Sequence, residues 1–394
     1  MKIDSQTFQL TDQGNIGKNS LIIGVIGLAL SIPGIFVNRS LFFHSYLIAF
    51  TFWFTLAIGG LFFVMLHHLV DATWSVVIRR LSENVMAILP IMAIFFIPIL
   101  FGIPDLYRWS HSDIVAQEVI LQKKAGYLNL PFFVIRTIIY FLAWTYMAWS
   151  LYKLSLKQDG GYEESQVIKM RRISAPGMLV FAFTLTFASF DWLMSLNDAW
   201  YSTIFGVYVF AGSTLVFLAF ITFVAIYLRE KGILVNAISF EHYHDLGKLL
   251  FTFVVFWGYI AFSQYFLIWY GNIPEETIWY KLRWAGGWKL ISLIILFGQF
   301  GLPFLGLIAR GPKRNLLVLK IMAVWLLLMH WVDIYWLIMP SYGDHKLHLS
   351  WMALTTMVGI GGIVIWFFWR KLSSAPLLPV NDPKLRASME FANA

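Results

Sequence analysis

The sequence predicts an all-α integral membrane protein that crosses the bilayer about ten times. Of its 394 residues, 59% are hydrophobic and only 13% are charged. A soluble globular chain carries roughly 25% charged residues, so this chain has too little charge to cover a water-facing surface. The high content of Phe (36) and Trp (18) fits contact with lipid and with the two membrane interfaces.

Ten apolar stretches are long enough to span a bilayer, which takes about 20 helical residues. The predicted spans are 20–37, 41–66, 84–102, 130–152, 174–195, 202–228, 248–270, 286–309, 315–340 and 350–370. The second also fits one long helix over 41–70 that continues beyond the membrane. Four prolines fall inside the spans, where neighbouring groups can satisfy the carbonyls that they free: Pro33, Pro90, Pro98 and Pro303.

The positions of Lys and Arg predict that both termini face the cytoplasm. Most of the 29 basic residues lie in the N-terminal segment 1–19, the C-terminal tail 371–394, and the loops after the second, fourth, sixth and eighth spans. Basic residues close to membrane spans concentrate on the cytoplasmic side. The membrane domain is then 20–370, and the longest polar stretch, 103–129, lies outside the cell membrane and is too short for a separate domain.

The membrane domain shows a weak internal repeat. The sequence GIPD follows the third span, and NIPE follows the seventh. Asp191 and Asp333 each begin a similar aromatic run near the outer ends of the fifth and ninth spans. The fourth and eighth spans each carry a basic residue shortly after their outer ends, Arg136 and Lys289.

These matches predict that the second to fifth spans (41–195) repeat as the sixth to ninth (202–340). Four helices return the chain to the side on which it started, so the two four-helix bundles would be parallel repeats, with the first and last spans flanking them. The alternative is a coincidence in an aromatic-rich sequence.

Charged residues inside the spans are the first group of candidate functional residues. A charge in hydrocarbon costs roughly 2.5–3.5 kcal/mol on insertion scales, so it usually faces a partner or a cavity. One interpretation is two structural ion pairs, Asp191 with Arg136 and Asp333 with Lys289. Another is a carboxylate that accepts a proton from a bound substrate. His330 lies three residues before Asp333 on one helix face and would assist, unless it is a buried histidine bonded to its neighbour.

A second group of candidates lies at the inner edge of the membrane. His68 and Asp71 end the second span, while His242, His244 and Asp245 precede the seventh, its counterpart in the repeat. These titratable groups would form a proton entry path in each bundle, or else a solvated interfacial cluster. No third ligand accompanies the two histidines of the HYH run, so no metal site is predicted.

Several classes of chemistry are not expected. The chain has no cysteine, which excludes thiolate-ligated iron–sulfur clusters. No histidines pair at matching depth for haem, and no phosphate-binding glycine loop or nucleophile elbow is present. The net charge of +8 resides in loops, so it indicates orientation rather than nucleic-acid binding. The chain is therefore predicted to hold no redox centre of its own.

Five runs of the sequence resemble one family of membrane subunits. They are HHLVDATWSVVIRRLSE (67–83), LNLPFFVIRTIIYFLAW (128–144), FASFDWLMSLNDAWYSTIFGVYVFAGS (187–213), HYHDLGKLLFTFVVFWGYIAFSQYFLIWYGNIPEETIWY (242–280) and MHWVDIYWLIMP (329–340). The runs are similar to the ActF family, known as quinone-binding subunit 2 of bacterial alternative complex III, within the NrfD and polysulfide-reductase superfamily. The resemblance covers nearly the whole chain.

The resemblance implies a subunit of a bacterial inner-membrane complex that oxidises menaquinol and reduces a periplasmic cytochrome c or a terminal oxidase. Haem and iron–sulfur clusters would belong to partner subunits, a multihaem cytochrome and an iron–sulfur protein, beside an ActC-like paralogue. This chain would contribute a quinone environment, a proton route or both. The polar positions implied are His68, Asp71, Asp191, His242, His244, Asp245, His330 and Asp333. The alternatives are a stand-alone secondary transporter and a purely structural anchor.

Overall fold

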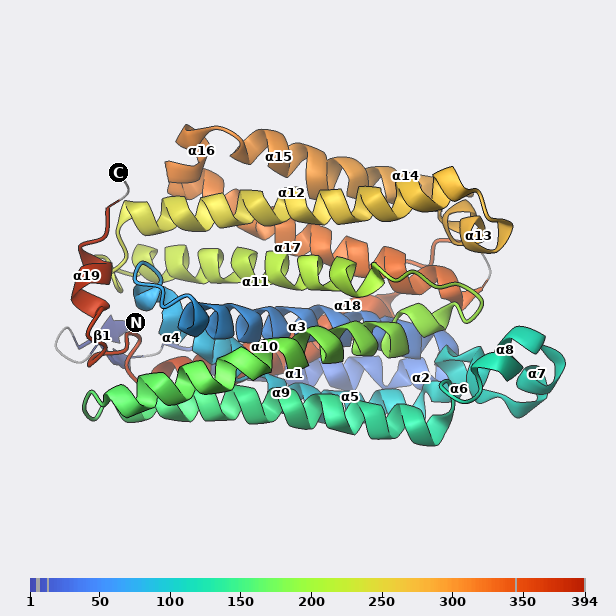
Figure 1. The fold of residues 1–394 in the computed structure, drawn as a ribbon, viewed down its shortest axis with the longest axis horizontal. Coiled ribbons are helices and arrows are strands. Elements are labelled where there is room, and N and C mark those ends of the chain that lie inside the picture. Colours follow the sequence, from blue (N-terminus) through green and yellow to red (C-terminus); the bar gives the residue numbers. More distant parts are fainter. Residues whose placement is uncertain (5–7, 13, 344–345, 393–394) are drawn as a thin grey trace.

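A computed structural model describes residues 1–4, 8–12, 14–343 and 346–392. Their regular structure is helical apart from a short antiparallel hairpin of β1 (Lys2–Ile3) and β2 (Leu10–Asp12). The long helices lie side by side along the long axis of the molecule, with both termini at one end (Figure 1). We call this end the terminal end and the opposite one the far end. The predicted all-α membrane fold is confirmed.

Ten helical segments among the described residues are long and apolar enough to cross a membrane, and they coincide with the ten predicted spans. The segments are α1 with α2 (Ile16–Ser31, Pro33–Val37), α3 (Arg39–Leu69), α4 with α5 (Val76–Met86, Leu89–Phe101), α9 (Leu130–Gln158), α10 (Glu164–Trp192), α11 (Phe205–Glu230), α12 (Phe240–Gly271), α14 with η3 and α15 (Trp288–Ile295, Leu296–Gly301, Leu302–Leu307), α17 (Leu316–Ile338) and α18 (Trp351–Ser374).

Short helices close both ends of the molecule. At the far end, the stretch 103–129 contains α6 (Ile103–Leu106), η1 (Arg108–Ser110), α7 (Ser112–Gln117) and α8 (Val119–Lys124). The far end also holds η2 (Met194–Leu196), α13 (Pro274–Arg283) and η4 (Met339–Tyr342), while α16 (Arg310–Arg314) and α19 (Leu385–Met389) lie at the terminal end. The predicted outer loop is therefore a small helical cap.

The prolines mark interruptions within the spans. Pro33, Pro90 and Pro303 each lie at the first or second position of a new helix, where a missing N–H costs nothing. They divide α1 from α2, α4 from α5, and η3 from α15. Pro98 alone of the four predicted positions lies inside a helix, α5. Three of the ten spans are therefore broken helices.

The two predicted four-helix bundles are present as two closed rings of neighbours. In the first, α3 packs on α4 and α5, α5 on α9, α9 on α10, and α10 on α3. In the second, α11 packs on α12, α12 on η3 and α15, α14 and η3 on α17, and α17 on α11. The order of spans is the same in both rings, as a parallel repeat requires. The first helix of each ring, α3 and α11, packs against the other and is the most buried of its ring.

The flanking helices pack against each other rather than on opposite sides of the molecule. α1 lies on α18, which in turn packs on α3 and α4. Glycines allow the close approach: a Cβ atom on Gly362 would lie only 2.5 Å from the Cα atom of Gly24, and one on Gly27 would lie 2.7 Å from the amide nitrogen of Gly359. Small residues give close helix contacts of this kind inside membranes.

Candidate functional site

The charges at the far end of the first bundle form a closed ion pair. Arg136 on α9 and Asp191 on α10 are buried and face each other, as one interpretation of the sequence predicts. Arg136 donates from Nε to Asp191 Oδ2 and from Nη2 to Oδ1, both at 2.8 Å. Tyr140 donates a third hydrogen bond to this carboxylate at 2.9 Å, and the guanidinium lies over the rings of Tyr127 and Phe132. Asp191 thus has a cation in direct contact with both of its carboxyl oxygens.

The corresponding carboxyl of the second bundle has no such partner within the part of the chain that the structure describes. Asp333 on α17 is buried and accepts a hydrogen bond on Oδ1 from the Tyr208 hydroxyl of α11. The predicted pair with Lys289 is wrong: among the described residues, these two form no ion pair. Lys289 is the second residue of α14, is exposed, and lies 5.6 Å from the Trp284 ring. A long lysine side chain near a helix end can extend its ammonium away from the bundle interior.

His330 connects the two bundles. Its Nε2 lies 2.8 Å from Thr55 Oγ1 of α3, and Thr55 itself donates to the Phe52 carbonyl at 2.9 Å. With the Thr55 hydroxyl donating to Phe52, Thr55 accepts from the Nε2–H of the imidazole, and Nδ1 of His330 is then the acceptor nitrogen. No described residue bonds this Nδ1. Gly212 of α11 lies beside the ring, since a Cβ there would be 3.2 Å from Cε1. The neighbour that His330 bonds is therefore Thr55, not Asp333.

At the terminal end, a cavity of about 260 Å³ opens at the mouth of the first bundle. His67, His68, Asp71, Arg79, Arg171 and Lys384 line it together with several apolar side chains. His68 is buried, and its Nε2 is bonded by no described residue. Two of the predicted inner candidates, His68 and Asp71, thus lie at one cavity.

Asp71 at the rim of this cavity is held by two cations. Lys384 Nζ lies 2.7 Å and Arg171 Nη2 lies 2.9 Å from Asp71 Oδ1. The hydrogen bond from Lys384, and then that from Arg171, lowers the pKa of Asp71. Asp71 also adopts a left-handed backbone conformation, with φ at 52°, which is uncommon for a residue other than glycine. It is a charged anchor near neutral pH.

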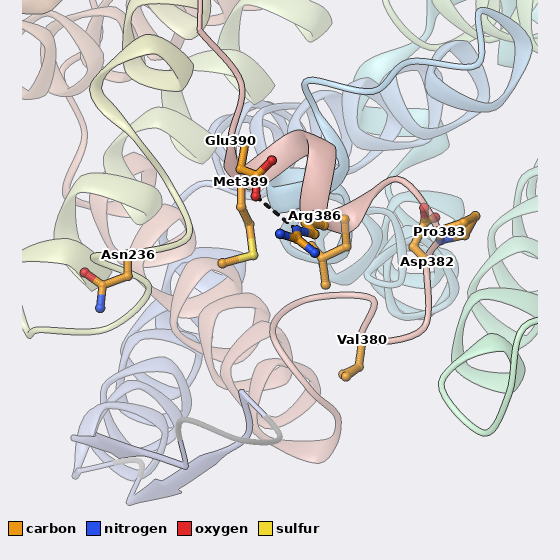
Figure 2. A pocket seen from close by; sticks show the side chains of 8 residues that line it. Asn236, Val380, Asp382, Pro383, Arg386, Met389 and Glu390 are labelled. Carbon is orange, nitrogen blue, oxygen red and sulfur yellow. Dashed lines mark hydrogen bonds and ion pairs between the residues drawn. The ribbon is translucent and has the colours of Figure 1, made fainter.

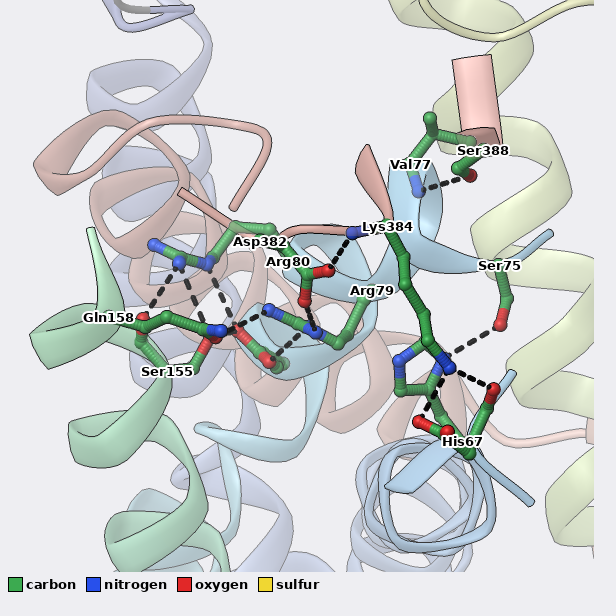
Figure 3. Close-up of polar contacts among 12 residues, drawn as sticks. His67, Ser75, Val77, Arg79, Arg80, Ser155, Gln158, Asp382, Lys384 and Ser388 are labelled. Carbon is green, nitrogen blue, oxygen red and sulfur yellow. Dashed lines mark hydrogen bonds and ion pairs between the residues drawn. The ribbon is translucent and has the colours of Figure 1, made fainter. Parts of the chain in front are cut away.

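The C-terminal tail forms one wall of the cavity. Lys384 and Asp382 belong to this tail, and Asp382 pairs with Arg79 of α4 (Figure 3). Ser388 of α19 donates to the Trp74 carbonyl at 2.9 Å and accepts from the Val77 amide at 3.3 Å. A second, more open cavity of about 410 Å³ lies between the tail and Asn236 (Figure 2). None of the predicted site residues lines that second cavity.

The predicted inner candidates of the second bundle are not part of the cavity at the first. His242 is the N3 residue of a capping box that begins α12, because its Nδ1 accepts the Ser239 amide at 3.0 Å. His244 lies 3.8 Å from Glu241, and Asp245 pairs with Lys248. The two predicted inner clusters therefore remain separate, and in the second one His242 shapes the helix terminus.

Sequence reasoning missed four polar residues that complete these sites. Tyr208 and Thr55 bind Asp333 and His330, as described above. Glu83, fully buried, pairs with both Arg79 and Arg80. Arg283 is buried at the end of α13. Tyr208 and Thr55 carry no charge, so they did not stand out within their spans. Glu83 and Arg283 lie near or beyond predicted span boundaries, so hydropathy gave no signal for them.

The fold and these buried charges define a multi-pass α-helical membrane protein in a lipid bilayer. No model of a known protein family matches the chain, and no curated protein matches it.

Proposed function

We propose that this chain is a membrane subunit of a quinol-oxidising complex of the alternative complex III type, and that Asp333 carries a proton in its reaction. The resemblance of the five sequence runs to the ActF family supports the complex. The buried carboxyl of Asp333, hydrogen-bonded by Tyr208 and in contact with no cation among the described residues, supports the proton-carrying role.

The two bundles differ in what their carboxyls are able to do. A buried carboxylate is costly unless it is paired, and it can lose its charge by taking up a proton. Asp333 has that option, while its hydrogen bond from Tyr208 stabilises the charged form after the proton leaves. Asp191 is already neutralised by Arg136. The proton-carrying role therefore falls on the second bundle, and the first-bundle pair is structural.

In this proposal the complex lies in the bacterial inner membrane with both termini in the cytoplasm. Menaquinol is the proposed reductant. Haem and iron–sulfur clusters reside in partner subunits, a multihaem cytochrome and an iron–sulfur protein, next to an ActC-like paralogue, and a terminal oxidase is a further partner. The cavity lined by His68 and Asp71 then lies on the cytoplasmic side, where it gives water access to the first bundle.

Asp333→Asn tests the proton-carrying role. Asp191→Asn, which breaks the structural pair of the first bundle, shows what destabilisation alone does to turnover. Each complex is isolated through a tag on this chain, and quinol oxidation and proton release are measured in proteoliposomes. We expect Asp333→Asn to assemble and to lose at least about tenfold in proton-coupled turnover, a typical effect of losing a proton-transfer group. An assembled Asp333→Asn complex with unchanged turnover and proton stoichiometry contradicts the role. A chain that purifies alone as an active transporter contradicts the complex.

A further inference from the structure

Arg283, at the far end of the second bundle, is a fully buried cation that forms an ion pair with none of the acidic residues that the structure describes. Its Nε donates to the Trp336 carbonyl and its Nη1 to the Trp279 carbonyl, both at 3.1 Å, and its Nη2 donates to the Leu337 carbonyl at 2.9 Å. The guanidinium lies 3.5 Å from the centre of the Trp279 ring. Burial lowers the pKa of Arg283 to about 9, so the side chain stays charged at neutral pH.

The carbonyls that Arg283 binds belong to the same helix end as Asp333. Trp336 follows Asp333 by three residues on α17, which is about 4.5 Å along the helix axis. Tyr208, whose hydroxyl binds Asp333, also lies within electrostatic range of Arg283. The second bundle thus holds one buried carboxyl on the last turns of α17 and one buried cation bound to the end of the same helix, and the described residues show no ion pair between them.

The first bundle holds the same two kinds of charge in direct contact, as Arg136 and Asp191. In the second bundle, three main-chain carbonyls and an aromatic ring hold the guanidinium away from Asp333. A positive charge at this distance still favours a nearby carboxylate, because in a poorly screened interior the interaction falls only slowly with distance. It leaves the carboxyl oxygens free of a contact pair, so a proton can still reach them.

We propose that Arg283 is a positioning residue that acts as the separated counter-charge of Asp333 and sets the pH at which Asp333 exchanges its proton. This inference rests on the proposed function of Asp333. The groups that face Asp333 are the hydroxyl of Tyr208 from α11 and the indole of Trp257 from α12, neither of them a cation. His330, three residues earlier on α17, bonds Thr55, and the Lys289 side chain of α14 is exposed. Arg283 is therefore the cation positioned to bias this carboxyl.

The test follows the carboxyl C=O stretch of Asp333 by infrared difference spectroscopy on the whole complex in membranes, over a pH series. Asp333→Asn identifies the band by its disappearance. In Arg283→Gln we expect the protonation midpoint of this band to move upward by roughly one pH unit, which corresponds to the loss of about 1.4 kcal/mol of charge–charge interaction. Lys289→Gln, which removes an exposed cation from the same end, should leave the midpoint in place.

Arg283→Lys separates charge from helix capping, because it keeps a cation but cannot bind three carbonyls with one rigid fork. The protonation midpoint of Asp333 in Arg283→Lys should lie closer to the midpoint in the unmodified protein than the midpoint in Arg283→Gln does. If the glutamine variant does not assemble, Arg283→Lys serves as the test. A midpoint that stays in place in an assembled Arg283→Gln complex overturns the inference while leaving the role of Asp333 intact. Failure of the proposed function would be seen in a different result, namely unchanged turnover of the Asp333→Asn complex.

Discussion

Arg136 and Asp191 are joined by two hydrogen bonds of 2.8 Å between one guanidinium and one carboxylate, inside the membrane domain. Only 8% of the arginine side chain and none of the aspartate side chain is exposed. Removal of one partner from such a pair leaves an unpaired buried charge, which typically costs about 3–5 kcal/mol.

We therefore expect Asp191→Asn to destabilise the protein by about that amount and to lower its thermal unfolding midpoint in detergent. The double variant Arg136→Met with Asp191→Leu should recover most of the loss, because it leaves no buried charge. Tryptophan fluorescence during a thermal ramp measures both. An unfolding midpoint for Asp191→Asn equal to that of the unmodified protein would show that the pair is not structural.

A second prediction concerns the glycine beside His330. A methyl group at position 212 would lie 3.2 Å from the imidazole Cε1, and the ring cannot retreat without giving up its bond to Thr55. Gly212→Ala should therefore cost about 1–3 kcal/mol through overpacking and reduce proton-coupled turnover several-fold.

Gly306→Ala is the control for this substitution. Its added methyl group would lie 3.3 Å from the sulfur of Met322, a similar distance, but a flexible thioether can move aside. Gly306→Ala should keep both stability and turnover. Equal behaviour of the two alanine variants in both measurements would count against a functional role for the His330 ring.

The fold was predictable to a large extent because its signals are long and local. Each span is an apolar run of helical length, and the GIPD and NIPE sequences each lead from the end of a span, α5 or α12, into a short helix, α6 or α13. Helix ends were less predictable. α12 begins eight residues before the predicted span, because the capping pair of Ser239 and His242 extends the helix into a polar segment.

The site was predictable only where charge and depth coincide. Arg136 and Asp191 lie at similar depth on the neighbouring helices α9 and α10, and they form the predicted ion pair. Lys289 has the same position in its span but lies on the exposed side of α14, and hydropathy does not distinguish a lipid-facing side from a buried one. Glu83 sits at a predicted span edge, where a charge normally suggests solvent; here it is paired inside the protein with two arginines.

A third prediction tests the orientation. The chain has no cysteine, so a single introduced cysteine reports one site. Gln117 in α7 at the far end and Ala387 in α19 at the terminal end are both exposed. We expect a membrane-impermeant maleimide to label Gln117→Cys in spheroplasts, and Ala387→Cys only after lysis, because basic residues favour a cytoplasmic terminal end. The reverse pattern of labelling would place both termini outside.

The last prediction concerns the attachment of the C-terminal tail over the cavity. Among the described residues, two ion pairs join the tail to the rest of the chain. Arg79 pairs with Asp382, and their side chains are 3% and 8% exposed; Lys384 pairs with Asp71, and theirs are 34% and 52% exposed. Exposed pairs contribute little, so Asp71→Asn should speed hydrogen exchange of the tail at most about fivefold. Asp382→Asn leaves Arg79 less compensated in the interior and should speed it far more, roughly a hundredfold.

The same attachment has a defined dependence on pH. Because Lys384 and Arg171 lower the pKa of Asp71, the ordered tail is favoured wherever this carboxyl is charged in the unfolded chain, above pH about 3.9. That contribution is lost as the pH falls through the lower pKa of the folded state. Protection factors of tail amides, corrected for intrinsic exchange, should thus be steady from about pH 5 to 8 and fall below pH 4. Glu390→Gln, which removes only the exposed pair with Arg386, is the control and should leave the protection factors of the tail amides unchanged. Tail protection that varies between pH 5 and 8 in the unmodified protein, but not in Asp71→Asn, would contradict this assignment.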